Sequence, residues 1–177
     1  MNIFILDEDP SGSARMLGDR HVVKMILESA QMLCLAHSLC GDPNLLPENW
    51  RNQAWKNHPC SKWVRASLQN YIWLANHAVE LCNEYTYRYG KIHKLSVLVS
   101  WLLANSPLLE NKGLLPFAAA TGEIHEADSV STYRRYYFEH KTHLMVWTKR
   151  EPPTWIIEKL PMIKIGDKWK LSGENDA

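Results

Sequence analysis

Residues 18 to 40 constrain the fold more than any other part of the chain, because their apolar side chains recur with the period of an α-helix. On a helical wheel of about 100° per residue, the main apolar arc consists of Val22, Val23, Ile26, Leu27, Ala30 and Leu33. Gly41 follows directly, and glycine commonly ends a helix. A helix that is apolar over much of its circumference tends to be buried. We therefore expect this helix at the centre of a helical domain.

The same helix carries four polar residues where a buried helix has little use for them. His21 and Glu28 are seven residues apart and point the same way, and Lys24 and Gln31 lie beside them. A buried polar group without a partner costs about 1–3 kcal/mol, so these side chains need partners. One interpretation is an internal set of bonds that includes a Lys24–Glu28 pair. The other is a functional site.

A second long helix is predicted from Ser61, as its N-cap, to Tyr89, with Gly90 at its end. Polar residues follow one border of its apolar arc at intervals of seven, seven and four: Asn70, His77, Glu84 and Arg88. They form either a boundary row with a surface ion pair of little energetic weight, or a row that faces the polar residues of the first helix across a cleft.

The remaining segments complete a fold that we predict to be mostly all-α. It is a compact single-domain bundle of three to five helices, with long connecting loops and a short N-terminal strand at NIFIL. A third helix is expected over residues 95–104 and a last one from the capping Asp128 to about Trp147. The domain spans residues 1–160, and a C-terminal tail, residues 161–177, forms a short hairpin or stays loose.

Several candidate ligand-binding residues lie on the last helix and at the ends of the second. Tyrosines beside cations are typical of nucleotide sites, where rings stack on bases and cations hold phosphates. The free N–H groups at a helix start also favour anions. The structural alternative is core packing and helix capping. The candidates are Asn57, His58, Asn70, Arg88, Lys91, His93, Tyr133, Arg134, Tyr137 and Lys141.

Composition narrows the class of protein. Twenty Lys and Arg against nineteen Asp and Glu give a net charge of +1, which argues against tight non-specific binding of duplex DNA through bulk charge and leaves room for a local basic pocket. The four cysteines form no CxxC pair and the histidines have no metal-ligand spacing, so neither a metal nor a cofactor is expected. A signal peptide and a membrane span are not expected either.

Three motifs carry a resemblance to a family of small bacteriophage proteins whose activity is not established. They are GDRHVVKM, KNHPCSKW and EYTYRYGKIH, and the resemblance extends over residues 1 to about 157. It implies a protein that works in the cytoplasm of an infected bacterial host.

The chain also resembles the phage pyrimidine-dimer DNA glycosylases, which are compact all-helical enzymes. The likeness rests on His21 and Glu28, seven residues apart on an early helix, and on Asn57-His58-Pro59 before the second helix. It implies a free N-terminal amine that attacks C1′ of the sugar, gives a Schiff base and then cleaves the strand. Only Glu28, His21 and the amine of Met1 take roles from it. Since Asn2 is bulky, Met1 is expected to be retained.

Three hypotheses follow, and the sequence leaves the ligand and the oligomeric state open. The first is a phage-type enzyme directed at a nucleotide or DNA base, glycosylase- or lyase-like. In it Glu28 stabilises positive charge at C1′, the amine of Met1 or Lys24 attacks, and His21 orients a group or moves a proton. Phosphates are held by Arg88, Lys91, Arg134 and Lys141. The second is a non-catalytic, anti-defence binder that sequesters a small phosphorylated nucleotide, and the third is a structural or interaction protein.

Overall fold

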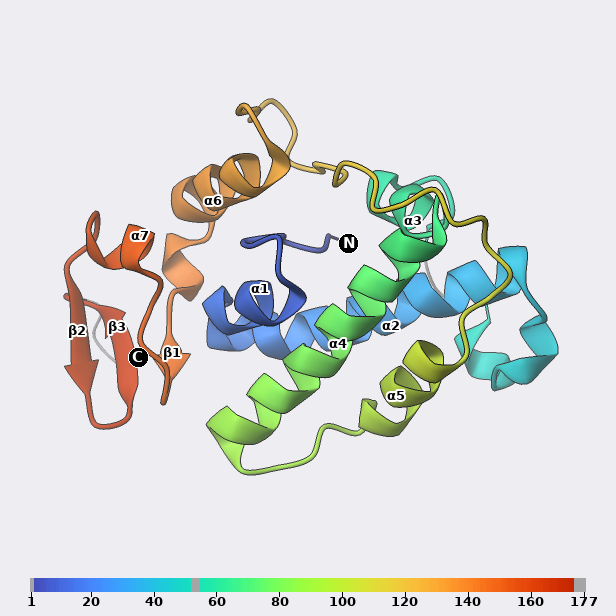
Figure 1. Ribbon diagram of the computed structural model, residues 1–177. Helices are drawn as coiled ribbons and strands as arrows, with labels where there is room; N and C mark the ends of the chain where they lie inside the picture. Colours follow the sequence, from blue (N-terminus) through green and yellow to red (C-terminus); the bar gives the residue numbers. More distant parts are fainter. Residues whose placement is uncertain (1, 52–54, 174–177) are drawn as a thin grey trace.

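The computed structural model describes residues 2–51 and 55–173, and these are mostly helical (Figure 1). The helices are α1 (Pro10–Met16), α2 (Asp19–Cys40), α3 (Pro59–Val64), α4 (Leu68–Tyr89), α5 (Ser96–Ala104), α6 (Ser129–His140) and α7 (Thr154–Ile157). Short 3-10 turns are η1 (Pro43–Leu45), η2 (Glu48–Trp50) and η3 (Thr142–Leu144), and the strands are β1 (Trp147–Thr148), β2 (Met162–Ile165) and β3 (Lys168–Leu171). The predicted mostly all-α class is confirmed.

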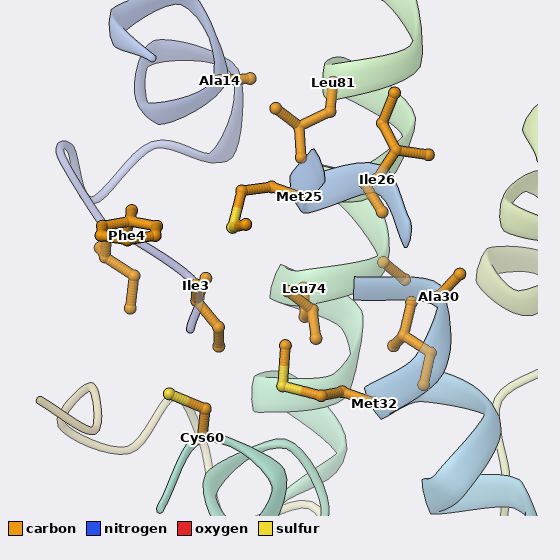
Figure 2. Close-up of a cluster of buried hydrophobic side chains, with 14 of the residues drawn as sticks. Ile3, Phe4, Ala14, Met25, Ile26, Ala30, Met32, Cys60, Leu74 and Leu81 are labelled. Atoms are coloured by element: carbon orange, nitrogen blue, oxygen red, sulfur yellow. The ribbon is translucent and has the colours of Figure 1, made fainter. Parts of the chain in front are cut away.

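Helices α2 and α4, of 22 residues each, cross at the centre of the molecule and build most of the core (Figure 1). Figure 2 shows Met25, Ile26 and Met32 of α2 beside Leu74 and Leu81 of α4, and all five side chains are at most 1% exposed. Such burial removes apolar surface from water, at about 25 cal/mol per Å². By length and composition α2 is apolar enough to cross a membrane, but 61% of its most apolar window is buried inside the protein.

One detail of the predicted α2 surface is wrong. Val23 and Leu27, which we placed in the buried arc, are 40% and 42% exposed, whereas Met25 and Met32 are buried. The core contacts the side of α2 that carries the methionines, because the N-terminal segment and α4 pack there. This leaves an outward face on α2 that includes two apolar side chains.

The predicted helix from Ser61 to Tyr89 is two helices, α3 and α4. The chain leaves the helical conformation after Arg65, and the hydroxyl of Ser67 accepts a hydrogen bond from the Gln69 N–H at 3.3 Å, so Ser67 is the N-cap of the longer helix. Serine at this position competes with continuation of a helix because its side chain bonds the local backbone. The end is as predicted, at Gly90 with a left-handed φ of 66°.

Two other helix boundaries differ from prediction. Helix α1 was missed: Asp9 accepts a hydrogen bond from the Gly12 N–H at 2.7 Å and Pro10 occupies the first turn, which is a normal helix start. The last long helix, α6, ends at His140 rather than near Trp147, since the chain turns through η3 and Trp147 enters β1.

The predicted N-terminal strand is also wrong, because residues 2–6 are buried and extended but are not paired with another strand. Side chains bind their backbone groups instead. The Leu6 N–H donates to the Ser13 hydroxyl at 3.1 Å, and Arg134 donates to the Leu6 carbonyl oxygen at 2.8 Å. Phe4 has a left-handed φ of 56°, and the segment runs through the middle of the molecule (Figure 1).

The described part of the C-terminal segment forms the hairpin β2–β3, and the hairpin is joined to the helical part through β1. The strand order is β1-β3-β2, with both pairs antiparallel. Trp147 of β1 is fully buried and is paired with Trp169 of β3. The sheet therefore lies at one end of the molecule, against the start of α2 (Figure 1).

Candidate active site

Glu28 of α2 lies where the N-terminal segment contacts the helix, and it is 9% exposed. Its Oε2 accepts a hydrogen bond from the backbone N–H of Asn2 at 2.8 Å. Its Oε1 lies 3.4 Å from the Nζ of Lys24, whose side chain is 67% exposed. The carboxylate thus joins the buried N-terminal segment to an amine at the surface. Met1, also predicted as a site residue, lies outside the described residues.

The side chain of Asn2 anchors the segment that contacts Glu28. Its Oδ1 accepts hydrogen bonds from the Tyr133 hydroxyl at 2.6 Å and the Ile3 N–H at 2.8 Å, and its Nδ2 donates to the Ala120 carbonyl oxygen at 3.0 Å. Tyr133 is fully buried, and burial raises its pKa well above the usual value, so it stays a neutral donor. The sequence did not indicate Asn2 as an anchor, and it suggested Tyr133 only as a ligand contact.

His21 lies under the same segment, 4% exposed, with its ring centroid 4.8 Å from that of Phe4. The Tyr137 oxygen accepts from the Gly18 N–H at 2.9 Å and forms a second hydrogen bond, of 2.8 Å, with His21 Nδ1. The pKa of His21 is lowered to about 4, mainly by burial and also by the positive charges of Lys141, Lys24 and His143. His21 is therefore neutral at pH 7 and fixed in orientation.

His58 approaches the same region from α3. Its ring caps that helix, accepting a hydrogen bond from the Cys60 N–H at 3.2 Å. Burial lowers the pKa of His58, and the negative charge of Glu28 acts in the opposite direction. Asn57 is exposed one residue earlier.

The outward face of α2 carries positive charge and no free acid. Arg20 and Lys24 are exposed there, while Glu28 accepts a hydrogen bond from the backbone N–H of Asn2. At one border of this face, a cavity of about 430 Å³ is lined by Val23, Tyr85, Tyr89 and Lys91. The charges of Lys141 and His143 lower the pKa of His21, in the first turn of the same helix. A polyanion fits such a face better than the net charge of the chain suggested.

Arg88 is internal, which excludes it as a phosphate contact in this conformation. Its side chain is fully buried, and its nitrogens donate to Glu84 and Asp19 at 3.0 Å each and to the carbonyl oxygens of Leu17 and Arg15. Arg150 binds the other side of Glu84. The predicted surface ion pair of Glu84 and Arg88 is therefore wrong, because the two side chains are 5% and 0% exposed and belong to an internal network.

Asn70 and His93 are also used by the fold. Asn70 is fully buried, donates to the Trp63 carbonyl oxygen at 2.7 Å and accepts from the Leu115 N–H at 2.9 Å. His93 accepts from the Leu95 N–H at 3.2 Å before α5. Neither side chain lies at the Glu28 site.

The remaining cations of α6 are accessible. Arg134 is about one-third exposed and donates to the Leu6 carbonyl oxygen, so it braces the N-terminal segment from outside. The ammonium of Lys141 lies 5.4 Å from the ring centroid of Tyr136.

Among the residues that the structure describes, no three His, Cys, Asp or Glu side chains gather as metal ligands.

Comparison with known families gives a match to the model of the family described as pyrimidine dimer DNA glycosylase, over residues 1–96. The chain belongs to the pyrimidine dimer DNA glycosylase family. The matched part contains Glu28, His21, Lys24 and His58, whereas α6 and the β-hairpin of this glycosylase-family protein lie beyond it. Neither a curated protein nor a solved structure matches the chain.

The family match confirms the predicted resemblance to the pyrimidine-dimer DNA glycosylases. It gives the coarse function as DNA-glycosylase-like, with DNA as the partner. In this member of the pyrimidine dimer DNA glycosylase family, the local charge on α2 is consistent with such a partner despite a net charge of only +1.

Proposed function

We propose that the protein is a DNA glycosylase and lyase in which an amine beside Glu28 attacks C1′ of a deoxyribose that carries a damaged pyrimidine. The observation that carries the proposal is the 2.8 Å hydrogen bond from the Asn2 N–H to Glu28. That nitrogen belongs to the peptide bond with residue 1, so Glu28 is bonded to the chain directly after the residue whose amine we assign as the nucleophile.

Two amines compete for the role of nucleophile, and their ordinary basicity favours the terminal one. Only the unprotonated amine attacks carbon. An α-amino group has a pKa of about 7.7–8.0 in the absence of perturbation, whereas a lysine has one of about 10.4. At neutral pH an ordinary α-amine is therefore unprotonated far more often than an ordinary lysine amine, which makes the terminal amine the first candidate. Lys24 is the second candidate because its Nζ lies 3.4 Å from Glu28.

The chemistry assigned to Glu28 follows from its position. A C1′–N bond forms to the amine while the bond from C1′ to the base breaks, and the base leaves with the electron pair and takes a proton. Glu28 accepts the proton that the amine loses and stabilises the positive charge that develops at C1′. The product is an imine between the protein and the opened sugar, from which strand cleavage follows.

His21 and the surface cations have supporting roles. His21 is buried and neutral, so we assign it the positioning of the segment above it, through Phe4 and Tyr137, rather than the transfer of a proton. We assign Lys91, Arg134 and Lys141 to DNA phosphates, joined by Arg20 on the exposed face of α2, because these side chains reach solvent. Arg88 has no such role.

Borohydride trapping tests the proposal. The intact protein is mixed with duplexes that contain a pyrimidine dimer or an abasic site, and the reduced adduct is mapped by proteolysis and mass spectrometry. The expected adduct is on the amine of residue 1, and an adduct on Lys24 assigns the attack to that side chain. Glu28→Gln should bind DNA but trap at least tenfold more slowly, whereas the exposed control Glu48→Gln should trap normally. Absence of any adduct from folded protein removes the proposal.

A second candidate is a non-catalytic binder that sequesters a small phosphorylated nucleotide. The cavity beside Val23 favours it, since about 430 Å³ lined by two tyrosines and a lysine suits a ligand of that size. A thermal-shift screen of nucleotides, followed by recovery of the ligand, separates the two functions: ligand recovered unchanged supports the binder, and turnover supports the enzyme.

A further inference from the structure

The second half of the chain carries an exposed hairpin that lies outside the family match. Strands β2 and β3 are joined by Gly166 and Asp167, with Gly166 at a φ of 62°, as the first central position of a type II′ turn requires. The hairpin projects from one end of the molecule, at the left of Figure 1. Its surface has no part in the Glu28 site.

The two faces of the hairpin differ. Directly paired residues share a face. Met162 and Trp169 lie on the inner face and pack against the core. The outer hairpin face consists of the cross-strand pairs Ile163–Lys170 and Ile165–Lys168. The two isoleucines are 38% and 53% exposed, and none of the four residues on this face is acidic.

Two further lysines lie beside the hairpin turn, and one of them, Lys164, is the inner-face partner of Trp169. Lys149 and Lys164 line a cavity of about 550 Å³ beside the turn, together with Arg150, Glu151, Gly166, Asp167 and Trp169. Glu84 binds Arg150, but Lys149 and Lys164 form no salt bridge within residues 2–51 and 55–173. Residues 162–171 contain three lysines and one aspartate. Positive charge is therefore available around the hairpin.

The backbone conformation at Lys149 fixes this lysine beside the hairpin turn. Lys149 has a φ of 58°, in the left-handed region that glycine adopts more easily than other residues. Its N–H donates to the Asp167 carbonyl oxygen, which fixes the corner against the hairpin turn. Its Nζ donates to the Tyr87 carbonyl oxygen at 3.4 Å, so the charge of this lysine is held at the same corner.

We propose that the hairpin binds the backbone of duplex DNA away from the lesion, through its outer face and through Lys149 and Lys164 beside the turn. A two-stranded ribbon fits a DNA groove, lysines neutralise phosphates, and exposed isoleucines contact the apolar edges of the groove. This inference rests on the proposed function, since that function supplies DNA as the partner. Charge complementarity selects a polyanion such as DNA as the partner of these lysines.

The test measures the affinity of the full chain for a long undamaged duplex over a range of salt concentrations. Each lost phosphate contact reduces the slope of log affinity against log salt by about 0.9. The double variant Lys164→Ala/Lys168→Ala should lose about tenfold in affinity at low salt and about two in slope. In Lys149→Gly, where glycine suits the left-handed backbone, the slope of log affinity against log salt should fall by about one. Lys112→Ala, on a loop remote from the hairpin, should match the wild type.

Schiff-base trapping of a saturating lesion-bearing oligonucleotide is measured on the same proteins, and its rate should not change. Hairpin variants with wild-type affinity and slope overturn the inference, and normal trapping then leaves the proposed function in place. If the wild type binds no duplex and traps nothing, both proposals fail. Binding to anionic vesicles or self-association through the hairpin, without duplex binding, overturns the DNA assignment of this face.

Discussion

At the scale of single residues, Asn2 shows how a site is held without a rigid secondary-structure element. Its backbone N–H binds Glu28, and its amide binds Tyr133 and Ala120 from the distant second half of the chain. Glu28 and His21 were predictable because helical spacing brings them to one side of α2. Asn2 was not, because its partners are more than a hundred residues away in the sequence and only the fold brings them together.

Asn2 and Tyr133 should act as one positioning unit. Asn2→Ala and Tyr133→Phe each remove the bond between Oδ1 and the hydroxyl, and we expect each to slow Schiff-base trapping by about tenfold or more, since small displacements of reacting groups cost rate. Each should lower the free energy of unfolding by about 1–3 kcal/mol. In a double-mutant cycle the two effects on trapping should not add. Additive effects contradict a shared role.

His21 should make stability depend on pH. Its pKa falls from 6.5 to about 4 on folding, so between these values the unfolded chain binds more protons than the folded one. Stability from this group is present above pH 6.5 and is lost as the pH falls toward 4, at up to 1.36 kcal/mol per pH unit. His77, whose pKa burial also lowers to about 4, adds in the same direction. The free energy of unfolding, measured with urea at several pH values between 4 and 6.5, should depend less steeply on pH in His21→Gln than in the wild type. An unchanged pH dependence counts against the assignment.

At the scale of elements, α2 and α4 show what periodicity predicts and where it stops. The bounds of α2 and the end of α4 were predicted correctly, because glycine and apolar spacing are local signals. The break before Ser67 and the exposure of Val23 and Leu27 depend on which neighbours pack against each side. The polar rows were visible, but one of them turned out to be an internal network around Arg88.

That network should be structural. Arg88→Ala leaves Glu84 and Asp19 with fewer partners in a buried setting, and we expect a loss of about 3–5 kcal/mol in the free energy of unfolding, measured by urea denaturation. At temperatures where the variant is folded, the salt dependence of DNA binding should match the wild type. A reduced salt slope would instead indicate a phosphate contact.

The outward face of α2 should contact DNA. Arg20→Ala removes an exposed cation on the same side as Lys24, and the slope of log affinity against log salt should fall by about one. The melting temperature should barely change, since surface substitutions usually have small effects. Fluorescence anisotropy with a lesion-bearing duplex measures the slope, and Lys112→Ala is again the matched control.

At the scale of the whole molecule, the family match and the folded unit are not the same length. Residues 1–96 contain the candidate catalytic groups, but Tyr133, Tyr137 and Trp147, all fully buried, come from the second half. A chain that ends at residue 96 should therefore fail to fold cooperatively. Circular dichroism and thermal melting test this, and a sharp two-state transition would contradict it.

The attachment of Asn2 to Glu28 also has a consequence for how the protein is made and handled. A formyl or acetyl group, or a leftover tag residue, on the amine of residue 1 would convert the proposed nucleophile into an inert amide. Protein with a blocked first residue would then be folded but inactive. Its activity would depend on removal of the blocking group, not on folding.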